Sequence, residues 1–519
     1  MPASYAFFFA PLQQQIKDMT NEIKGLVGQT AIYGLSSILG RLLNYLLVPL
    51  YTNYFLTHEF GVITLMYSYV AILIVVITHG METTFFRFNE REQFGRETVF
   101  GTSLLSVLSF ALFFLLLALS FRGEIASFLQ YPDNTEYVIW FAIIISIDAL
   151  SAIPFAKLRA QNKAFRFAFV KLLGIGVNIF LVLFFVVFAP MIVSREGSAM
   201  ANIVATFYNP GIGVGYVFIA NLVASSITLL LLLPVIFRSE IRFSMGVWKE
   251  MISYALPLLV AGLAGVLNEA LDKPLLQRLL PEDIAMSHLG IYGACYRVSV
   301  LMILFIQAFR FAAEPFFFAQ YKNENAQLLY ARVMKIFVIT CLFIFLGIML
   351  YMDIIQYFIG KDFREGLDIV PILLMAHIFL GIYFNLSIWY KLTGQTRFGA
   401  YIAVIGAFIT IAVNVIFIPI AGYYASAWGH LVCYLCMTLI SWYWGRKHYP
   451  IAYDIPRIFL FIISALMLYG LHSLVPETTR VAGWFISAAF LGVFAFSVLA
   501  IDREARETII PALLKLLKR

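Results

Sequence analysis

Long apolar segments follow one another along this chain of 519 residues, with short polar stretches between them. A helix needs about 20 apolar residues to cross a hydrocarbon core about 30 Å thick. Fourteen segments have that length, namely residues 28–53, 58–82, 98–121, 134–158, 165–190, 211–237, 248–272, 287–311, 330–352, 368–390, 398–420, 424–445, 456–475 and 481–501. The pattern predicts an all-α membrane protein with about 14 transmembrane helices.

Lysine and arginine are distributed unequally among the connections between these segments. Connections on the side of the N-terminus, together with the span ends that adjoin them, hold 27 of the 36 Lys and Arg residues, and those on the other side hold seven. Short connections rich in these residues stay in the cytoplasm. We therefore expect an even number of spans, both termini in the cytoplasm, and a location in the bacterial inner membrane.

Composition agrees with this class and narrows the function. The chain is 62% hydrophobic and 13% charged, whereas soluble proteins are about 45–50% apolar and about 25% charged. The net charge of +7 follows from the uneven connections, so no nucleic-acid partner is expected. Cys433 and Cys436 form a C-x2-C inside an apolar span without a second pair, and we interpret them as packing residues rather than a metal site. The sequence has no G-x4-G-K-[ST] and no H-E-x-x-H motif. We therefore expect that the protein is not an enzyme and that it binds no metal or other cofactor.

Two parts of the chain repeat each other. Residues 157–165 read KLRAQNKAF and residues 391–399 read KLTGQTRFG, which share the pattern K-L-x-[AG]-Q-x-[KR]. Gly61 and Gly290 are each followed by a tyrosine six residues later. Because six spans separate the copies, both have the same orientation, which predicts two parallel six-helix lobes.

This repeat predicts the domain organisation. We expect a cytoplasmic lead, an N-lobe, a C-lobe, two further helices and a basic cytoplasmic tail, at residues 1–27, 28–237, 248–445, 456–501 and 502–519. The natural start is Met1 or Met19. The tail forms either a short amphipathic helix on anionic lipid or a basic extension that serves only orientation.

Small and polar residues inside the predicted spans form two matching stripes. They are Gly34, Ser37, Arg41 and Asn44 in the first span, and Gly262, Gly265, Glu269 and Asp272 in the seventh. Both sets have spacings of 3, 4 and 3, which place them on one face of a helix. Further ionisable residues within or beside spans are Asp148, Lys273 and Arg297.

Ionisable groups at membrane depth usually face a cavity or a partner. We predict a cavity between the lobes in which Arg41 and Arg297 bind an anionic group, because the guanidinium fork suits phosphate. Glu269 would pair with Arg41 when no substrate is bound. The alternative is a structural ion pair with small residues for helix packing.

Several other charged or polar residues have two interpretations. Asp148 and Glu269 are candidates for coupling to H⁺ or Na⁺. The alternative for Asp148 is that it serves only to hydrogen-bond a neighbouring helix, and Lys273 is an obvious partner for the carboxylates of Glu269 and Asp272.

His377 is interpreted as a packed histidine. The pairs Glu82 with Arg87 and Arg310 with Glu314 are interpreted as anchors at inner helix ends.

Three stretches carry a resemblance to a known group of proteins. They are GRLLNYLLVPLYTNYFLTHEFGVITLMYSYV (residues 40–70), LDKPLLQRLLP (residues 271–281) and LGIYGACYRVS (residues 289–299). The chain resembles polysaccharide-biosynthesis flippases of the MOP superfamily, which also contains multidrug (MATE) exporters, lipid II flippases and O-antigen flippases of the Wzx type. The resemblance extends over nearly the whole chain from about residue 22.

The resemblance implies transport of a polyprenyl-diphosphate-linked oligosaccharide from the inner to the outer leaflet, for lipopolysaccharide O-antigen or another surface polysaccharide. It implies a substrate site at Arg41, Arg297, Asn44, Ser37, Glu269, Asp272 and Lys273, and a polysaccharide polymerase or glycosyltransferase as partner. Two transport alternatives remain, a cation-coupled multidrug exporter and a lipid II flippase. A membrane enzyme such as a polymerase would need larger outer connections than this chain has.

Overall fold

The computed structural model describes residues 34–36, 38–195, 198–321, 323–476, 479–502 and 506. Every regular element in these ranges is a helix, and thirteen helices are long and apolar enough to cross a membrane. They coincide with the second to fourteenth predicted spans, so the all-α membrane class is confirmed. The first predicted span lies only partly within the described residues. The lead, Ser37 and most of the tail lie outside them.

The chain divides into two compact units. Unit 1 comprises the chain up to Leu47 together with Leu73–Leu259. Its elements are α4 (Met81–Asn89), η1 (Glu92–Phe94), α5 (Arg96–Ser120), α6 (Arg122–Phe128), α7 (Thr135–Ala160), α8 (Ala164–Leu183), η2 (Phe184–Phe188), α9 (Ala189–Val193), α10 (Ala199–Ala205), η3 (Pro210–Ile212), α11 (Gly215–Phe237) and the first part of α12 (Met245–Ala270). Helix α7 packs against α5 and α11, and α11 also packs against α8.

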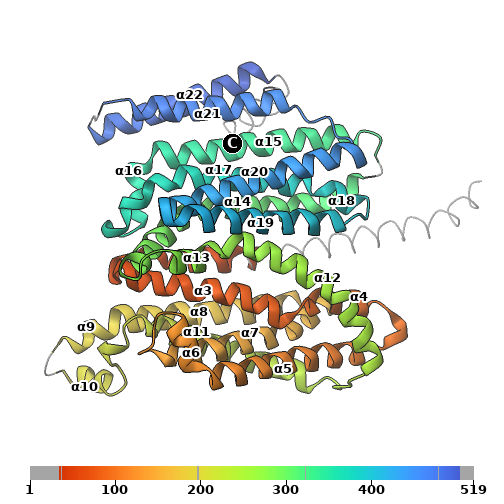
Figure 1. The fold of residues 1–519 in the computed structure, drawn as a ribbon, viewed down its shortest axis with the longest axis vertical. Helices are drawn as coiled ribbons and strands as arrows, with labels where there is room; N and C mark the ends of the chain where they lie inside the picture. Colours follow the sequence, from red (N-terminus) through yellow and green to blue (C-terminus); the bar gives the residue numbers. More distant parts are fainter. Residues whose placement is uncertain are drawn as a thin grey trace, which may run out of the picture. The chain divides into compact units, whose positions relative to one another are not determined.

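Unit 2 comprises Val48–Ile72 and the chain from Val260 onward. It holds α2 (Val48–Tyr54), most of α3 (Thr57–Thr78), the end of α12, α13 (Asp272–Leu279), α14 (Glu282–Gln320), α15 (Ala326–Leu350), α16 (Met352–Ile355), η4 (Gln356–Phe358), η5 (Lys361–Ile369), α17 (Val370–Leu386), α18 (Ile388–Leu392), α19 (Arg397–Ala421), α20 (Tyr423–His448), α21 (Ile455–Ser473) and α22 (Arg480–Ile501). Helix α17 contacts α14, α15 and α20, and α21 and α22 lie along α15 (Figure 1). The predicted lobe boundaries stay a prediction.

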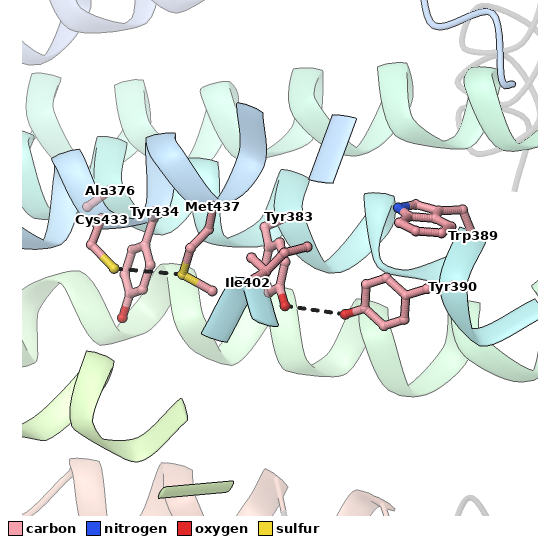
Figure 2. Packing of buried hydrophobic residues seen from close by; sticks show 8 residues of the cluster. All are labelled: Ala376, Tyr383, Trp389, Tyr390, Ile402, Cys433, Tyr434 and Met437. Atoms are coloured by element: carbon pink, nitrogen blue, oxygen red, sulfur yellow. Dashed lines mark hydrogen bonds between the residues drawn. The ribbon is translucent and has the colours of Figure 1, made fainter. Parts of the chain in front are cut away.

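A buried aromatic cluster holds α17, α18, α19 and α20 together (Figure 2). The hydroxyls of Tyr383 and Tyr390 are 3.3 Å apart, and Trp389 is 1% exposed. The Cys433 thiol lies 3.7 Å from the Met437 sulfur and 3.4 Å from the Gly406 carbonyl oxygen. Cys433 is therefore a packing residue, as interpreted from its apolar surroundings in the sequence.

The two glycines of the internal repeat contact each other. A Cβ added to Gly290 of α14 would lie 1.8 Å from the carbonyl oxygen of Thr57 in α3, and one added to Gly61 would lie 2.1 Å from that of Met286. At each glycine, the close contact thus comes from the residue four positions before the other glycine. Such reciprocal contact is what a local two-fold relation between equivalent segments produces.

The first lysine of each repeated motif forms an ion pair. Lys157 is 8% exposed and lies 2.8 Å from a Glu97 carboxylate oxygen and 2.8 Å from the Ser239 hydroxyl. Lys391 lies 2.8 Å from a Glu314 oxygen. The motif lysines therefore fasten α7 to α5 and α18 to α14.

The residues interpreted as anchors at inner helix ends also contact other elements of the fold. Glu82 pairs with Arg159 at 2.9 Å, and the Arg87 guanidinium lies 4.1 Å above the Tyr254 ring. Arg310 does approach Glu314, at 3.8 Å.

The end of α22 is tied to α15 by a buried ion pair. The Lys335 ammonium lies 2.5 Å from an Asp502 carboxylate oxygen, and the two side chains are 6% and 0% exposed. Breaking such a pair by removing one member is strongly destabilising, because the other charge stays buried.

Candidate functional site

A buried polar cluster lies in unit 2 around Asp272, the first residue of α13. Asp272 is 1% exposed. One of its carboxylate oxygens accepts a hydrogen bond from the Tyr292 hydroxyl at 2.5 Å and lies 3.1 Å from Nε2 of His430. The other oxygen lies 3.0 Å from the Lys273 ammonium. Helices α13, α14 and α20 thus converge on a single carboxylate.

Aromatic rings enclose the positive member of this cluster. The Lys273 ammonium lies 4.5 Å from the centre of the Tyr296 ring and donates to the backbone oxygen of Glu269 at 3.0 Å. Tyr296 in turn contacts the rings of His377 and His430, at centroid distances of 5.6 and 5.7 Å. The cation is held by one carboxylate, one carbonyl and two aromatic faces, since the Tyr292 ring lies 5.7 Å away, and these groups together replace much of its hydration.

The Asp272 carboxyl belongs to α13, outside the thirteen helices that could cross a membrane. Burial raises its pKa, but the Lys273 charge and the hydrogen bonds from His430 and Tyr292 outweigh burial and bring the pKa below its usual range. Asp272 therefore stays ionised at neutral pH.

Two polar atoms beside this ion pair lack a hydrogen bond within the described part of the chain. They are Nδ1 of His430 and the Tyr296 hydroxyl, and both are buried. Buried polar groups are nearly always satisfied by protein or by ordered water. The cluster therefore retains hydrogen-bonding capacity for a water molecule or another small polar guest.

The other predicted residues of unit 2 lie around this cluster. The Glu269 side chain is exposed, and only its backbone oxygen binds Lys273. Arg297 is half-buried and follows Tyr296 on α14, close enough to Tyr51 of α2 to act electrostatically on it. The predicted partnership of Lys273 with Asp272 is confirmed, whereas the Glu269 carboxylate is not bound to Lys273.

In unit 1, Arg41 and Asn44 are exposed on the helical residues 38–45. Gly40 of this segment packs against Ile175 of α8, and Lys171 of α8 lies near enough to Arg41 for their charges to interact. Arg41 therefore belongs to a pair of cations that the sequence analysis did not identify. The predicted Arg41–Glu269 pair and the cavity between the lobes stay predictions.

Asp148 lies half-buried on α7, where its carboxylate accepts a hydrogen bond from Ser225 of α11. The Ser225 hydroxyl also lies 3.4 Å from the Asn221 amide oxygen. This is the contact to a neighbouring helix that the sequence analysis gave as one alternative for Asp148. It does not exclude the other alternative, since a hydrogen-bonded carboxylate also binds cations.

Sequence reasoning missed His430 and Tyr292. His430 is 158 positions from Asp272 along the chain and Tyr292 is 20 positions away, so neither shares a helical repeat with it. The only available signal was a polar residue on an apolar span, the property that singled out His377. His377 is fully buried against Tyr296, as a packed histidine would be.

A family model of polysaccharide biosynthesis proteins matches residues 26–320. The inward closed conformation of the lipid II flippase MurJ aligns with 92% of this chain and 99% of that chain, at 14% identity and a TM-score of 0.68. An inward-facing multidrug resistance transporter of the MATE family covers 80% of this chain and 94% of its own, at 16% identity and a TM-score of 0.62.

A MOP superfamily transporter from Pyrococcus furiosus aligns with 81% of this chain and 95% of its own, at 15% identity and a TM-score of 0.58. No curated protein has a matching sequence. Since the family model covers more than half of the chain and thirteen of its helices could cross a membrane, the protein is a multi-pass membrane protein that belongs to the polysaccharide biosynthesis protein family.

Proposed function

We propose that the protein translocates a polyprenyl-diphosphate-linked oligosaccharide from the inner to the outer leaflet of the bacterial inner membrane, by alternating access. The observation that carries this proposal is the family match over residues 26–320, because that family is described by polysaccharide biosynthesis. The near-complete alignment with a lipid II flippase supports it.

The charges fit such a substrate. A diphosphate linked to a sugar cannot cross hydrocarbon unaided, because burying an unpaired charge costs many kcal/mol. Arg41 and Arg297 bind the diphosphate in this proposal, and Lys171 strengthens the positive potential beside Arg41. Asn44 and Ser37 of the first stripe, with Glu269 of the second, accept sugar hydroxyls. Asp272 and Lys273 neutralise each other and position α13 beside α14.

Ion coupling forms part of the proposal. The charge of Asp272 is already neutralised by Lys273. We therefore assign H⁺ or Na⁺ coupling to a carboxylate that does not contact a lysine in this way. Asp148 and Glu269 are the two candidates from the sequence. A polysaccharide polymerase or glycosyltransferase would receive the translocated lipid.

A reconstituted transport assay tests the proposal. Purified protein in liposomes is given a fluorescent lipid-linked oligosaccharide, and the fraction reaching the opposite leaflet is measured. Arg41→Ala and Arg297→Ala should each abolish transport while the protein stays folded. The control is Arg122→Ala, which removes an exposed charge on α6. Full transport by both site variants, or equal loss in the control, contradicts the proposed roles.

A cation-coupled multidrug exporter is the second candidate, favoured by the fold shared with the MATE transporter and by the hydrogen-bonded Asp148. It predicts that Asp148→Asn abolishes efflux of a cationic dye, whereas Arg41→Ala leaves efflux intact. The flippase instead predicts no dye efflux by the wild-type protein, with loss of lipid-linked oligosaccharide transport in Arg41→Ala.

A further inference from the structure

A basic groove lies in unit 1, apart from the residues to which the proposed function assigns a role. Its volume is about 500 Å³ and its lining residues are Arg87, Phe88, Arg91, Lys249, Glu250, Ser253 and Tyr254. Helix α4 supplies one wall and the beginning of α12 the other. These helices approach closely at Gly80, where an added Cβ would lie 3.0 Å from the backbone oxygen of Ala255.

Aromatic rings position the two arginines of the groove. The Arg87 guanidinium lies 4.1 Å from the centre of the Tyr254 ring, and that of Arg91 lies 4.7 Å from the centre of the Phe88 ring. A guanidinium stacked on a ring keeps its N–H groups at the edge of its plane available to an acceptor. Both forks are thus oriented before any ligand arrives, which lowers the entropic cost of binding.

The groove carries an excess of positive charge. In the part of the chain that the structure describes, Arg87, Arg91 and Lys249 form no ion pair with a carboxylate. Glu250 is the single acidic residue among the lining residues, so the groove has a net charge of +2. Helix α12 begins at Met245, one turn before Lys249, and its N-terminal dipole adds to the positive potential.

We propose that this groove binds the diphosphate of the lipid-linked substrate before translocation. The inference rests on the proposed function and assigns a second, separate site for the same head group. Two guanidinium forks and one ammonium match two adjacent phosphates better than the single phosphate of a phospholipid. Arg87 and Arg91 belong to a connection on the predicted cytoplasmic side, and Lys249 begins the span that follows another such connection. Such a substrate is made on that side of the membrane.

Binding of farnesyl diphosphate to the purified full-length protein in nanodiscs of neutral lipid tests this site. The double variant Arg87→Gln/Arg91→Gln should raise the dissociation constant about tenfold or more. The matched control is Arg238→Gln/Arg242→Gln, which removes two exposed charges of the same unit outside the groove. It should change the constant less than twofold. Unchanged binding in the groove variant, or equal weakening in both, overturns the proposal.

Further measurements separate the alternatives. Phosphatidylglycerol in the nanodisc should compete poorly, and displacement of the probe at the affinity of the diphosphate would make the groove an anionic-phospholipid site, which overturns the proposal. If the double variant does not fold, Lys249→Gln alone at its exposed position should weaken binding. If the wild-type protein transports the lipid but the groove variants bind the probe normally, only the groove proposal is refuted. If the wild-type protein binds the probe through the groove but transports no lipid-linked oligosaccharide, only the proposed function is refuted.

Discussion

Gly290→Ala tests the reciprocal contact between α3 and α14. The new methyl group would lie 1.8 Å from the Thr57 carbonyl oxygen, and ordinary Cβ contacts begin at 3.4 Å. The obstacle is backbone, so the two helices must move apart. Overpacking of this kind costs about 1–3 kcal/mol. Alanine favours a helix by about 1 kcal/mol over glycine, so any net loss of stability comes from the contact itself.

The assay is thermal unfolding of the purified variant in detergent, followed by size-exclusion fluorescence. Gly347→Ala is the matched control, because Gly347 lies within α15 and has no atom within 4 Å of an added Cβ. We expect Gly290→Ala and Gly61→Ala to lower the unfolding temperature and Gly347→Ala to leave it unchanged or raised.

The reciprocity makes a sharper claim about the double variant. One separation of the helices accommodates both methyl groups, so Gly61→Ala/Gly290→Ala should cost clearly less than the sum of the single variants. A Gly290→Ala protein as stable as the Gly347→Ala protein would refute the close approach. Strictly additive single effects would refute the shared contact.

Two further predictions concern buried charges. Asp272→Asn should lower stability by about 3–5 kcal/mol, since it leaves Lys273 buried without its carboxylate. Because its pKa is lowered in the folded protein, ionised Asp272 stabilises the fold at all pH values above the usual pKa range of a carboxyl. This contribution is lost only as the pH falls through the lower pKa of the folded state. The loss of unfolding free energy in Asp272→Asn should therefore be constant between pH 5 and 8. Glu97→Gln should cost more than about 1 kcal/mol because Lys157 is buried. Glu82→Gln, which breaks an exposed pair, should cost about 0–1 kcal/mol, and equal losses in chemical unfolding of the two variants would contradict this reasoning.

The sequence was sufficient for features that depend on neighbouring residues. Thirteen spans follow from apolar length alone. The Asp272–Lys273 pair was expected because its members are adjacent in the chain. The repeat offset of the two glycines was visible as a pattern, and the structure brings these residues into contact.

Features that depend on how helices rotate against each other were not predictable. Glu82 was interpreted as an anchor at an inner helix end, and no residue near it in the chain indicated its ion-pair partner. Its partner is Arg159 on α7. His430 and Tyr292 reach Asp272 only because α20 and α14 present these faces to α13. An apolar helix with one polar residue gives no indication of the direction in which that residue points.

The ion pair between Lys335 and Asp502 has a consequence for biosynthesis. Lys335 is made 167 residues before Asp502, and in the folded protein both charges are buried. While the ribosome is still translating the last two helices, the ammonium of α15 lacks the carboxylate that it contacts in the finished protein. A chain interrupted before Asp502 would lack that carboxylate, so we expect it to be less stable than the full-length protein.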